Sequence, residues 1–197
     1  MSDFKPLEGL SNLPHEDQIA LSQFGQGPHR PVPRLNVHEA FESQVDTHPN
    51  AIAAVFEHET VTYQQLELAA NRLANYLLAS GLQPKEQVCL VVSRSLEMLV
   101  GIFAILKAGC QYVPIDGGVA SDKQLGHIFH DTGVNHILCL PKFKNRVQLF
   151  AKTSTHITSL ALSAYFEQSS ERPAVNCAPA HGCYAIYTSG KGNLLIM

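Results

Sequence analysis

The sequence lacks any marked excess of charge of one sign. It has 14 lysine and arginine residues against 17 aspartate and glutamate residues, which gives a net charge of −3. A strongly basic surface is what attracts nucleic acid or an anionic membrane. The composition therefore predicts neither nucleic acid nor a membrane as a partner.

Long hydrophobic runs are also missing. The most apolar stretch, residues 98–106, lies between Glu97 and Lys107 and falls far short of the roughly 20 residues that span a bilayer. We interpret it as a buried helix. Residues 1–6 lack the apolar segment of a secretory signal peptide.

Cysteine is scarce and scattered, with five residues in the chain: Cys89, Cys110, Cys139, Cys177 and Cys183. An odd number without close pairs argues against a disulfide framework, and small buried thiols are favoured over catalysis or zinc binding. No Asn-x-Ser/Thr sequence is present. These absences predict a cytoplasmic protein.

The sequence does contain enough apolar material for one domain, since 45% of its 197 residues are hydrophobic. Residues 1–36 contain prolines and glycines near their end and only a weak helical pattern at 13–23. We predict a linker or flexible tail over residues 1–36 and a domain over residues 37–197.

Within the predicted domain, short β-prone runs alternate with helical patterns. Thr62 with Gln65 predicts a helix that begins with a capping box, and Gly81 is expected to end it. A hairpin with His58-Glu59 at its turn is expected before that helix. The predicted strands are 51–56, 60–63, 88–92, 111–115, 135–140, 157–160 and 183–187; the predicted helices begin near 37, 62, 95, 121 and 145, and 163–180 is mostly loop.

Apolar strands that alternate with helices are typical of parallel sheets covered on both faces. The pattern therefore predicts an α/β fold with a layered, mainly parallel sheet and flanking helices.

The last predicted strand leads into a loop with the chemistry of an anion site: Thr188, Ser189, Gly190, Lys191 and Gly192. Consecutive backbone N–H groups can converge on a phosphate, and glycine lets the chain approach closely. The hydroxyls add donors and the lysine adds positive charge. The Walker pattern of P-loop proteins is absent, because position 185 is not glycine and no Ser or Thr follows Lys191.

Three phrases stand in a fixed order along the chain. They are Val61-Thr-Tyr-Gln-Gln-Leu66, Leu106-Lys-Ala-Gly-Cys-Gln-Tyr-Val-Pro-Ile-Asp116 and Tyr184-Ala-Ile-Tyr-Thr-Ser-Gly190. Together they resemble the first core motifs of adenylation domains of non-ribosomal peptide synthetases, within the AMP-forming acyl-activating superfamily. The resemblance covers about residues 37–190 and implies the N-terminal portion of the large subdomain of AMP-forming ligases.

The resemblance implies an activity for the complete family enzyme. Such an enzyme converts an amino acid, or another carboxylic acid, and ATP with Mg²⁺ into an acyl-adenylate and pyrophosphate. It then loads the acyl group onto a phosphopantetheine thiol of a carrier domain. The first two phrases are expected to be structural, and Thr188, Ser189, Gly190, Lys191 and Gly192 are expected to hold the ATP phosphates.

After Gly190 the sequence departs from the family pattern. The family loop is rich in Ser, Thr and Gly and ends in Pro-Lys-Gly, whereas this chain reads Lys191-Gly192-Asn193. We favour a gapped alignment, in which Lys191-Gly192 is the end of a shortened loop and Leu194–Ile196 is the apolar strand that follows it.

The acyl pocket, adenine and ribose contacts and catalytic lysine of the family lie downstream. We therefore expect these 197 residues alone to be catalytically inactive, with tight ATP binding in doubt.

Two alternatives stay open beside this interpretation. The chain could be a non-catalytic interaction protein that binds a synthetase or carrier domain, or an acyl-CoA synthetase-like fragment. An incomplete transcript of a full-length enzyme is a further reading. The sequence does not indicate the substrate, because the specificity pocket of the family lies beyond Met197.

Other candidate sites carry weaker patterns. Metal ligands could come from His127, His130, Asp131 and His136. The favoured interpretation is a helix face exposed to solvent. Ser189 lacks the Gly-x-Ser-x-Gly surroundings of a hydrolase nucleophile. Asp116 follows a strand end, where α/β sheets often bind ligands, yet a turn before Gly117-Gly118 is the favoured interpretation.

Overall fold

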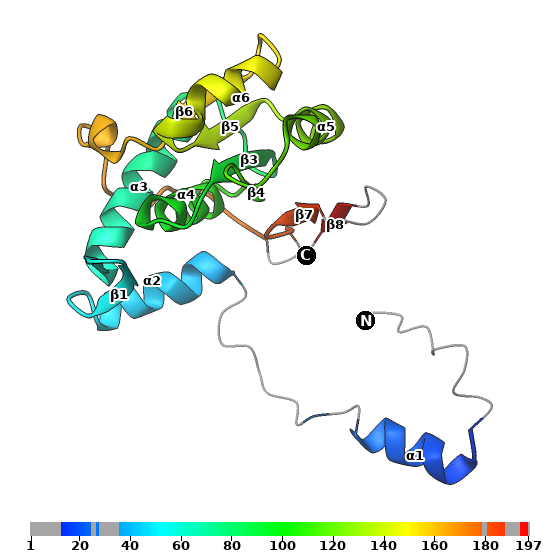
Figure 1. The fold of residues 1–197 in the computed structure, drawn as a ribbon. Helices are drawn as coiled ribbons and strands as arrows, with labels where there is room; N and C mark the ends of the chain where they lie inside the picture. The colour runs from blue at the N-terminus through cyan, green and yellow to red at the C-terminus, as the bar shows by residue number, and fades with distance from the viewer. Residues whose placement is uncertain (1–12, 25–26, 28–35, 179–180, 188–193, 197) are drawn as a thin grey trace. The chain divides into compact units, whose positions relative to one another are not determined.

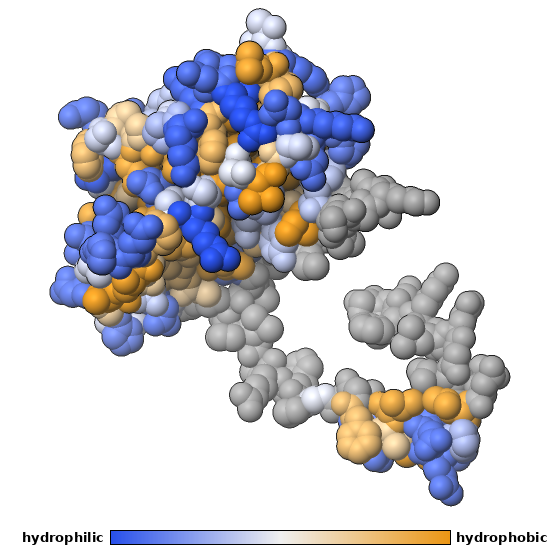
Figure 2. Space-filling view, viewed as in Figure 1, coloured by the Kyte–Doolittle hydropathy of each residue, from blue (hydrophilic) through white to orange (hydrophobic). Residues whose placement is uncertain are grey.

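The computed structural model describes residues 13–24, 27, 36–178, 181–187 and 194–196, the last for their backbone only. The chain divides into two units, Met1–Pro33 and Arg34–Met197, which we describe separately. In the first, α1 (His15–Phe24) buries none of its residues. Figure 2 shows apolar side chains along α1, and Phe24 is 87% exposed. A helix thus forms where the sequence carries a weak helical pattern.

The second unit contains the remaining elements (Figure 1). In chain order they are α2 (Val37–Thr47), β1 (Ile52–Phe56), β2 (Glu59–Thr62), α3 (Tyr63–Ala79), β3 (Gln87–Val92), α4 (Leu96–Lys107), β4 (Gln111–Asp116), α5 (Asp122–Thr132), β5 (His136–Cys139), η2 (Pro141–Phe143), α6 (Lys144–Phe150), β6 (His156–Ser159), η3 (Leu162–Tyr165), β7 (Ala185–Tyr187) and β8 (Leu194–Ile196). This alternation of helices and strands confirms the predicted α/β class.

The central sheet has the strand order β4-β3-β5-β6, and each neighbouring pair is parallel. Its middle strand β3 is buried on both faces, as the continuous apolar run predicts. Val88 and Leu90 belong to the core that includes α3 and α4, whereas Cys89 and Val91 belong to the core that includes α5 and α6. The alternation of side chains along β3 therefore builds two hydrophobic layers.

Strands β1 and β2 form the predicted antiparallel hairpin, but its turn differs from the expectation. Phe56 pairs with Glu59, so that the turn consists of Glu57 and His58, one position earlier than predicted. Glu57 adopts a positive φ of 53°. The sequence offered no glycine or asparagine there that would have marked this turn.

Local capping signals explain where the helices begin. The Thr62 hydroxyl accepts a hydrogen bond from the Gln65 backbone N–H, and the Gln65 side chain accepts one from the Thr62 N–H. This confirms the predicted capping box at the start of α3. Ser121 and Gln124 form the same arrangement at the start of α5.

The prediction of small buried thiols is confirmed for three of the five cysteines, whereas Cys177 and Cys183 are half-buried. Every cysteine is a free thiol, and Cys89, Cys110 and Cys139 are buried. Burial raises the pKa of the Cys89 thiol to about 12 and that of Cys139 to about 11. Among the described residues, no helix is long and apolar enough to cross a bilayer.

A stacked histidine pair, of which His136 is buried and His156 exposed, joins β5 to β6. His136 is 4% exposed, and its ring stacks on that of His156 with centroids 5.1 Å apart. Its Nδ1 atom has no hydrogen-bond partner among the described residues. Burial lowers the pKa of His136, and His156 lowers it further, while Glu86 opposes the shift. The neutral ring is therefore the form that the folded chain favours.

This burial predicts a loss of stability on mild acidification. Above pH 6.5 the ring is neutral in both states; as the pH falls from 6.5 toward the lower folded pKa, only the unfolded chain takes up the proton, and the free energy of unfolding decreases. The dependence of the free energy of unfolding on pH that this one histidine contributes cannot exceed about 1.4 kcal/mol per pH unit.

The measurement is urea unfolding between pH 7.5 and 5.0 for the wild type and for His136→Leu. We expect the wild type to lose more stability than the variant over this range. His38, whose pKa is also lowered by burial, remains in both proteins, so its contribution cancels in the difference. If the free energy of unfolding falls equally with pH in the two proteins, the pH-dependent loss of stability does not come from His136.

Candidate functional site

The predicted phosphate loop lies in the interval between β7 and β8. The structure does not describe the predicted phosphate ligands, so their role stays a prediction; they are Thr188, Ser189, Gly190, Lys191 and Gly192. The strands on either side are described.

Strands β7 and β8 pair in an antiparallel manner, with Ala185 opposite Ile196 and Tyr187 opposite Leu194. Residues 188–193 therefore connect the facing ends of two neighbouring strands. A strand at 194–196 is what the gapped alignment expects after a shortened loop.

Strand β7 runs beside β4, the strand of the second sequence phrase. The Tyr112 backbone N–H donates to the Cys183 carbonyl oxygen at 3.3 Å, and Tyr112 and Tyr184 form a parallel bridge. Their rings stack with centroids 5.4 Å apart, and Ala185 is fully buried in the core around α5. The second and third phrases, far apart in the sequence, thus lie next to each other.

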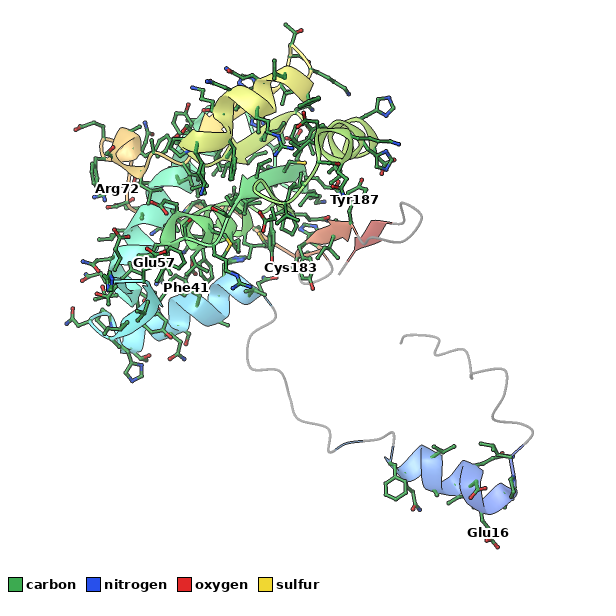
Figure 3. All side chains as sticks on the ribbon, in the orientation of Figure 1. Glu16, Phe41, Glu57, Arg72, Cys183 and Tyr187 are labelled. Carbon is green, nitrogen blue, oxygen red and sulfur yellow. The ribbon has the colours of Figure 1, made fainter. Side chains whose placement is uncertain are left out.

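The last residue of β7 is held by α5 (Figure 3). The Tyr187 hydroxyl donates to Asp131 Oδ2 at 2.5 Å, and the His127 ring meets the Tyr187 ring edge-on with centroids 6.2 Å apart. Burial and this hydrogen bond raise the pKa of Tyr187. The neutral phenol therefore fixes the chain immediately before Thr188.

The alternative metal site is not assembled by the fold. Asp131 accepts the hydrogen bond from Tyr187, and His136 stacks on His156 in the sheet, away from the face that holds His127. Across the described part of the chain, no group of three His, Cys, Asp or Glu side chains could hold a metal ion.

Asp116 has a structural role in a closed turn. Its Oδ1 atom accepts from the Gly118 N–H at 2.9 Å, and Arg146 donates to the carbonyl oxygens of Gly117 and Ala120. A Cβ atom on Gly117 would lie 2.6 Å from the ring of Phe143, so that aromatic side chain covers the turn. The turn interpretation of Asp116 accounts for all of these contacts.

Sequence reasoning missed a set of paired charges that runs from the buried side chains of Glu67 and Lys107 to the exposed side chain of Asp46. We call it the charge cluster; it consists of Glu42, Asp46, Glu67, Lys107 and Arg172. Lys107 belongs to the second sequence phrase, and its side chain is only 1% exposed. Its Nζ atom is paired with Glu42 and lies 2.9 Å from Glu67 Oε2. The only signal in the sequence was a lysine at the end of an apolar helix, and its partners lie 40 and 65 residues earlier.

The chain combines a parallel sheet between helical layers with a separate antiparallel pair, β7 and β8, and such α/β domains commonly hold ligands at strand ends. The sequence profile of one family, described as AMP-binding enzyme, matches residues 41–190. The chain belongs to this family.

Two curated relatives illustrate the relationship. The chain is 37% identical over 183 residues to adenylate-forming reductase 06235 of Coprinopsis cinerea, an alignment that covers 92% of this chain and 18% of the relative. It is 36% identical over 182 residues to tyrocidine synthase 3 of Brevibacillus parabrevis, covering 90% of this chain and 3% of the relative. The chain therefore spans 18% or less of the length of these relatives.

Among solved structures, the nonribosomal peptide synthetase FmoA3 has the same fold in this region. Its form with bound α-methyl-L-serine-AMP aligns with a TM-score of 0.82 at 23% identity, covering 91% of this chain and 20% of that chain. Its AMPPNP-bound form aligns with a TM-score of 0.78 at 24% identity, covering 90% and 19%. The predicted fold and the predicted family are both confirmed.

Proposed function

We propose that this chain is the phosphate-binding part of an adenylation domain. The whole protein would activate an amino acid, or another carboxylic acid, with ATP and pass the acyl group to a phosphopantetheine thiol of a carrier domain. The observation that carries the proposal is the β7–β8 pairing, which brackets Thr188–Gly192 between two adjacent strand ends, within a chain of the AMP-binding enzyme family.

The proposed chemistry of the loop is electrostatic. Transfer of an adenylyl group to a carboxylate releases pyrophosphate, so negative charge develops on the leaving group. Backbone N–H groups, the hydroxyls of Thr188 and Ser189 and the ammonium of Lys191 are the donors in this segment of the sequence. They would hold the β- and γ-phosphates while the carboxylate attacks the α-phosphorus.

Magnesium would arrive as part of the MgATP substrate complex. The described residues contain no set of carboxylate, imidazole or thiol groups that could hold a metal by itself. Mg²⁺ typically keeps several waters and binds through substrate phosphates, which suits a loop that offers donors and positive charge.

The first test is equilibrium titration of the chain with a fluorescent ATP analogue and MgCl₂. We expect saturable binding, and a loss of affinity of about tenfold or more in Lys191→Gln because a charged hydrogen-bond donor is removed. The exposed Lys152 gives a matched control, and Lys152→Gln should bind like the wild type. Equal affinities of Lys191→Gln and the wild type would refute the assignment of the loop.

The second test separates binding from turnover. Because the chain spans 18% or less of its relatives, we assign it phosphate binding and not the complete reaction. ATP–pyrophosphate exchange with a pool of amino acids should therefore stay at the level of a protein-free control. Substantial exchange by these 197 residues would overturn this division.

A further inference from the structure

A long segment without helix or strand leads from η3 toward β7. We call residues 166–178 the strap. An irregular segment of this length loses much conformational entropy when it is ordered, so its fixed course requires specific contacts. These contacts come from α2, α3 and the end of α4.

Two asparagines of α3 hold the backbone of the strap. Asn71 donates to the Ser170 carbonyl oxygen at 2.9 Å. Asn75 donates to the carbonyl oxygens of Ser169 and Glu171 at 2.8 and 2.9 Å. The side chains of one helix face thereby replace the backbone partners that a strand would have provided.

Arg172, the residue of the strap that follows, enters the charge cluster. Its Nε atom donates to Glu67 Oε1 at 2.7 Å, and its terminal nitrogens donate to both Asp46 oxygens, at 2.7 Å for Oδ1. One guanidinium thus joins the strap to α2 and α3 in a fork geometry that lysine cannot reproduce.

Lys107 extends the same cluster to the end of α4. It neutralises Glu67 and Glu42 from the opposite side, deep in the protein. Next to it, Gly109 lies against the strap, since a Cβ atom there would be 2.7 Å from Val175 Cγ1. The strap is therefore seated where α4 turns into β4, the strand that is bridged to Tyr184, the residue before β7.

The energetics indicate positioning more than net stability. Buried ion pairs roughly break even against hydrophobic packing, because the cost of desolvation offsets the attraction. Such pairs enforce one geometry: Glu67 is the buried carboxylate that Arg172 contacts, so displacement of Arg172 removes one of the two cations that compensate it. A cluster that spans α2, α3, α4 and the strap fixes their mutual arrangement.

We propose that Arg172 is a positioning residue: through the charge cluster it fixes the strap, and through the strap it sets the place of β7, the strand that precedes the phosphate loop in the sequence. The reference to the loop rests on the proposed function. The positioning of β7 does not.

The test compares Arg172→Gln with a matched control, Arg146→Gln. Both arginines are partly exposed and bind carboxylate and carbonyl oxygens, but Arg146 holds the turn after β4. Hydrogen exchange followed by mass spectrometry reports on peptides of the strap, of residues 181–187 and of the central strands β3 and β5, without any nucleotide.

In Arg172→Gln we expect exchange about tenfold faster in the strap and in residues 181–187, with β3 and β5 unchanged. Arg172→Lys, which keeps the charge but not the fork, should fall between this variant and the wild type. Arg146→Gln should accelerate exchange only near residues 117–122. Uniform acceleration across all peptides in Arg172→Gln, or unchanged exchange in residues 181–187, would overturn the proposal.

The same variants are then titrated with the fluorescent ATP analogue. A positioning role predicts weaker binding in Arg172→Gln and unaltered binding in Arg146→Gln. If the wild type does not bind the analogue, the proposed function fails while the exchange result still decides the role of Arg172. If it binds and Arg172→Gln binds equally well, the link from the strap to the loop is refuted.

Discussion

Replacing Lys107 by methionine is expected to lower the free energy of unfolding by about 3–5 kcal/mol, the cost of breaking a buried ion pair by removing one partner. The substitution keeps the length of the side chain and removes its charge. Glu67, whose side chain is 6% exposed, and Glu42, at 18%, would then lose the ammonium that compensates them. Arg172 would remain as their cation, at 2.7 Å from Glu67 Oε1 and 3.8 Å from Glu42 Oε1, but its side chain is 40% exposed.

The measurement is urea unfolding at pH 7.5. Lys123 is exposed on α5, so Lys123→Met should change stability by no more than about 0.5 kcal/mol. The double variant Lys107→Met/Glu67→Gln also removes one of the two carboxylates that Lys107 neutralises and should recover part of the loss. A cost for Lys107→Met as small as that of Lys123→Met would show that the cluster is not electrostatically coupled.

The elements that could be predicted from the sequence are those specified by local signals. The capping box at Thr62, the apolar run of β3 and the helix end at Gly81 depend on residues within a few positions of each other, and each appears where it was expected. The hairpin turn was misplaced by one residue because Glu57, an unusual residue for a positive φ, occupies it.

What the sequence could not provide is pairing across long separations. Lys107 was identified as part of a structural phrase, but its ion pair with Glu42 brings together residues 65 positions apart, and Arg172 lies 105 positions from Glu67. Hydrophobic periodicity indicates which face of a helix is buried, but it does not indicate which charged side chains pair there. The same limit applies to Tyr187 and Asp131, which lie 56 positions apart.

The candidate site was predicted through its chemistry and through family resemblance. Glycine, hydroxyls and lysine after a strand are the close approach, donors and charge that an anion site requires, and the sequence prediction rests on them. The structure adds the course of the flanking strands: β7 lies between β4 and β8, and its last side chain is tied to α5. The support of the site is therefore a matter of tertiary structure, whereas its donors can be identified in the sequence.

Gly109→Ala is expected to cost about 2–5 kcal/mol, for two separable reasons. Gly109 has φ of +74°, and a left-handed conformation costs an L-residue about 1–2 kcal/mol. The added Cβ would also lie 2.7 Å from Val175 Cγ1 and 3.2 Å from Cys177 Sγ, and overpacking of this kind typically costs about 1–3 kcal/mol. Because valine is stiff at χ1, the strap itself would have to move.

Gly133 provides the matched control for this prediction. It also has a positive φ, +59°, but a Cβ atom there would meet nothing within 4 Å. Gly133→Ala should therefore show the backbone cost alone, about 1–2 kcal/mol, in the same urea unfolding assay. The double variant Gly109→Ala/Val175→Ala should be less destabilised than the sum of its single variants, because the clash is removed. Equal costs at Gly109 and Gly133 would mean that the strap does not press on the second sequence phrase, and would remove one of the contacts by which it is seated beside β4.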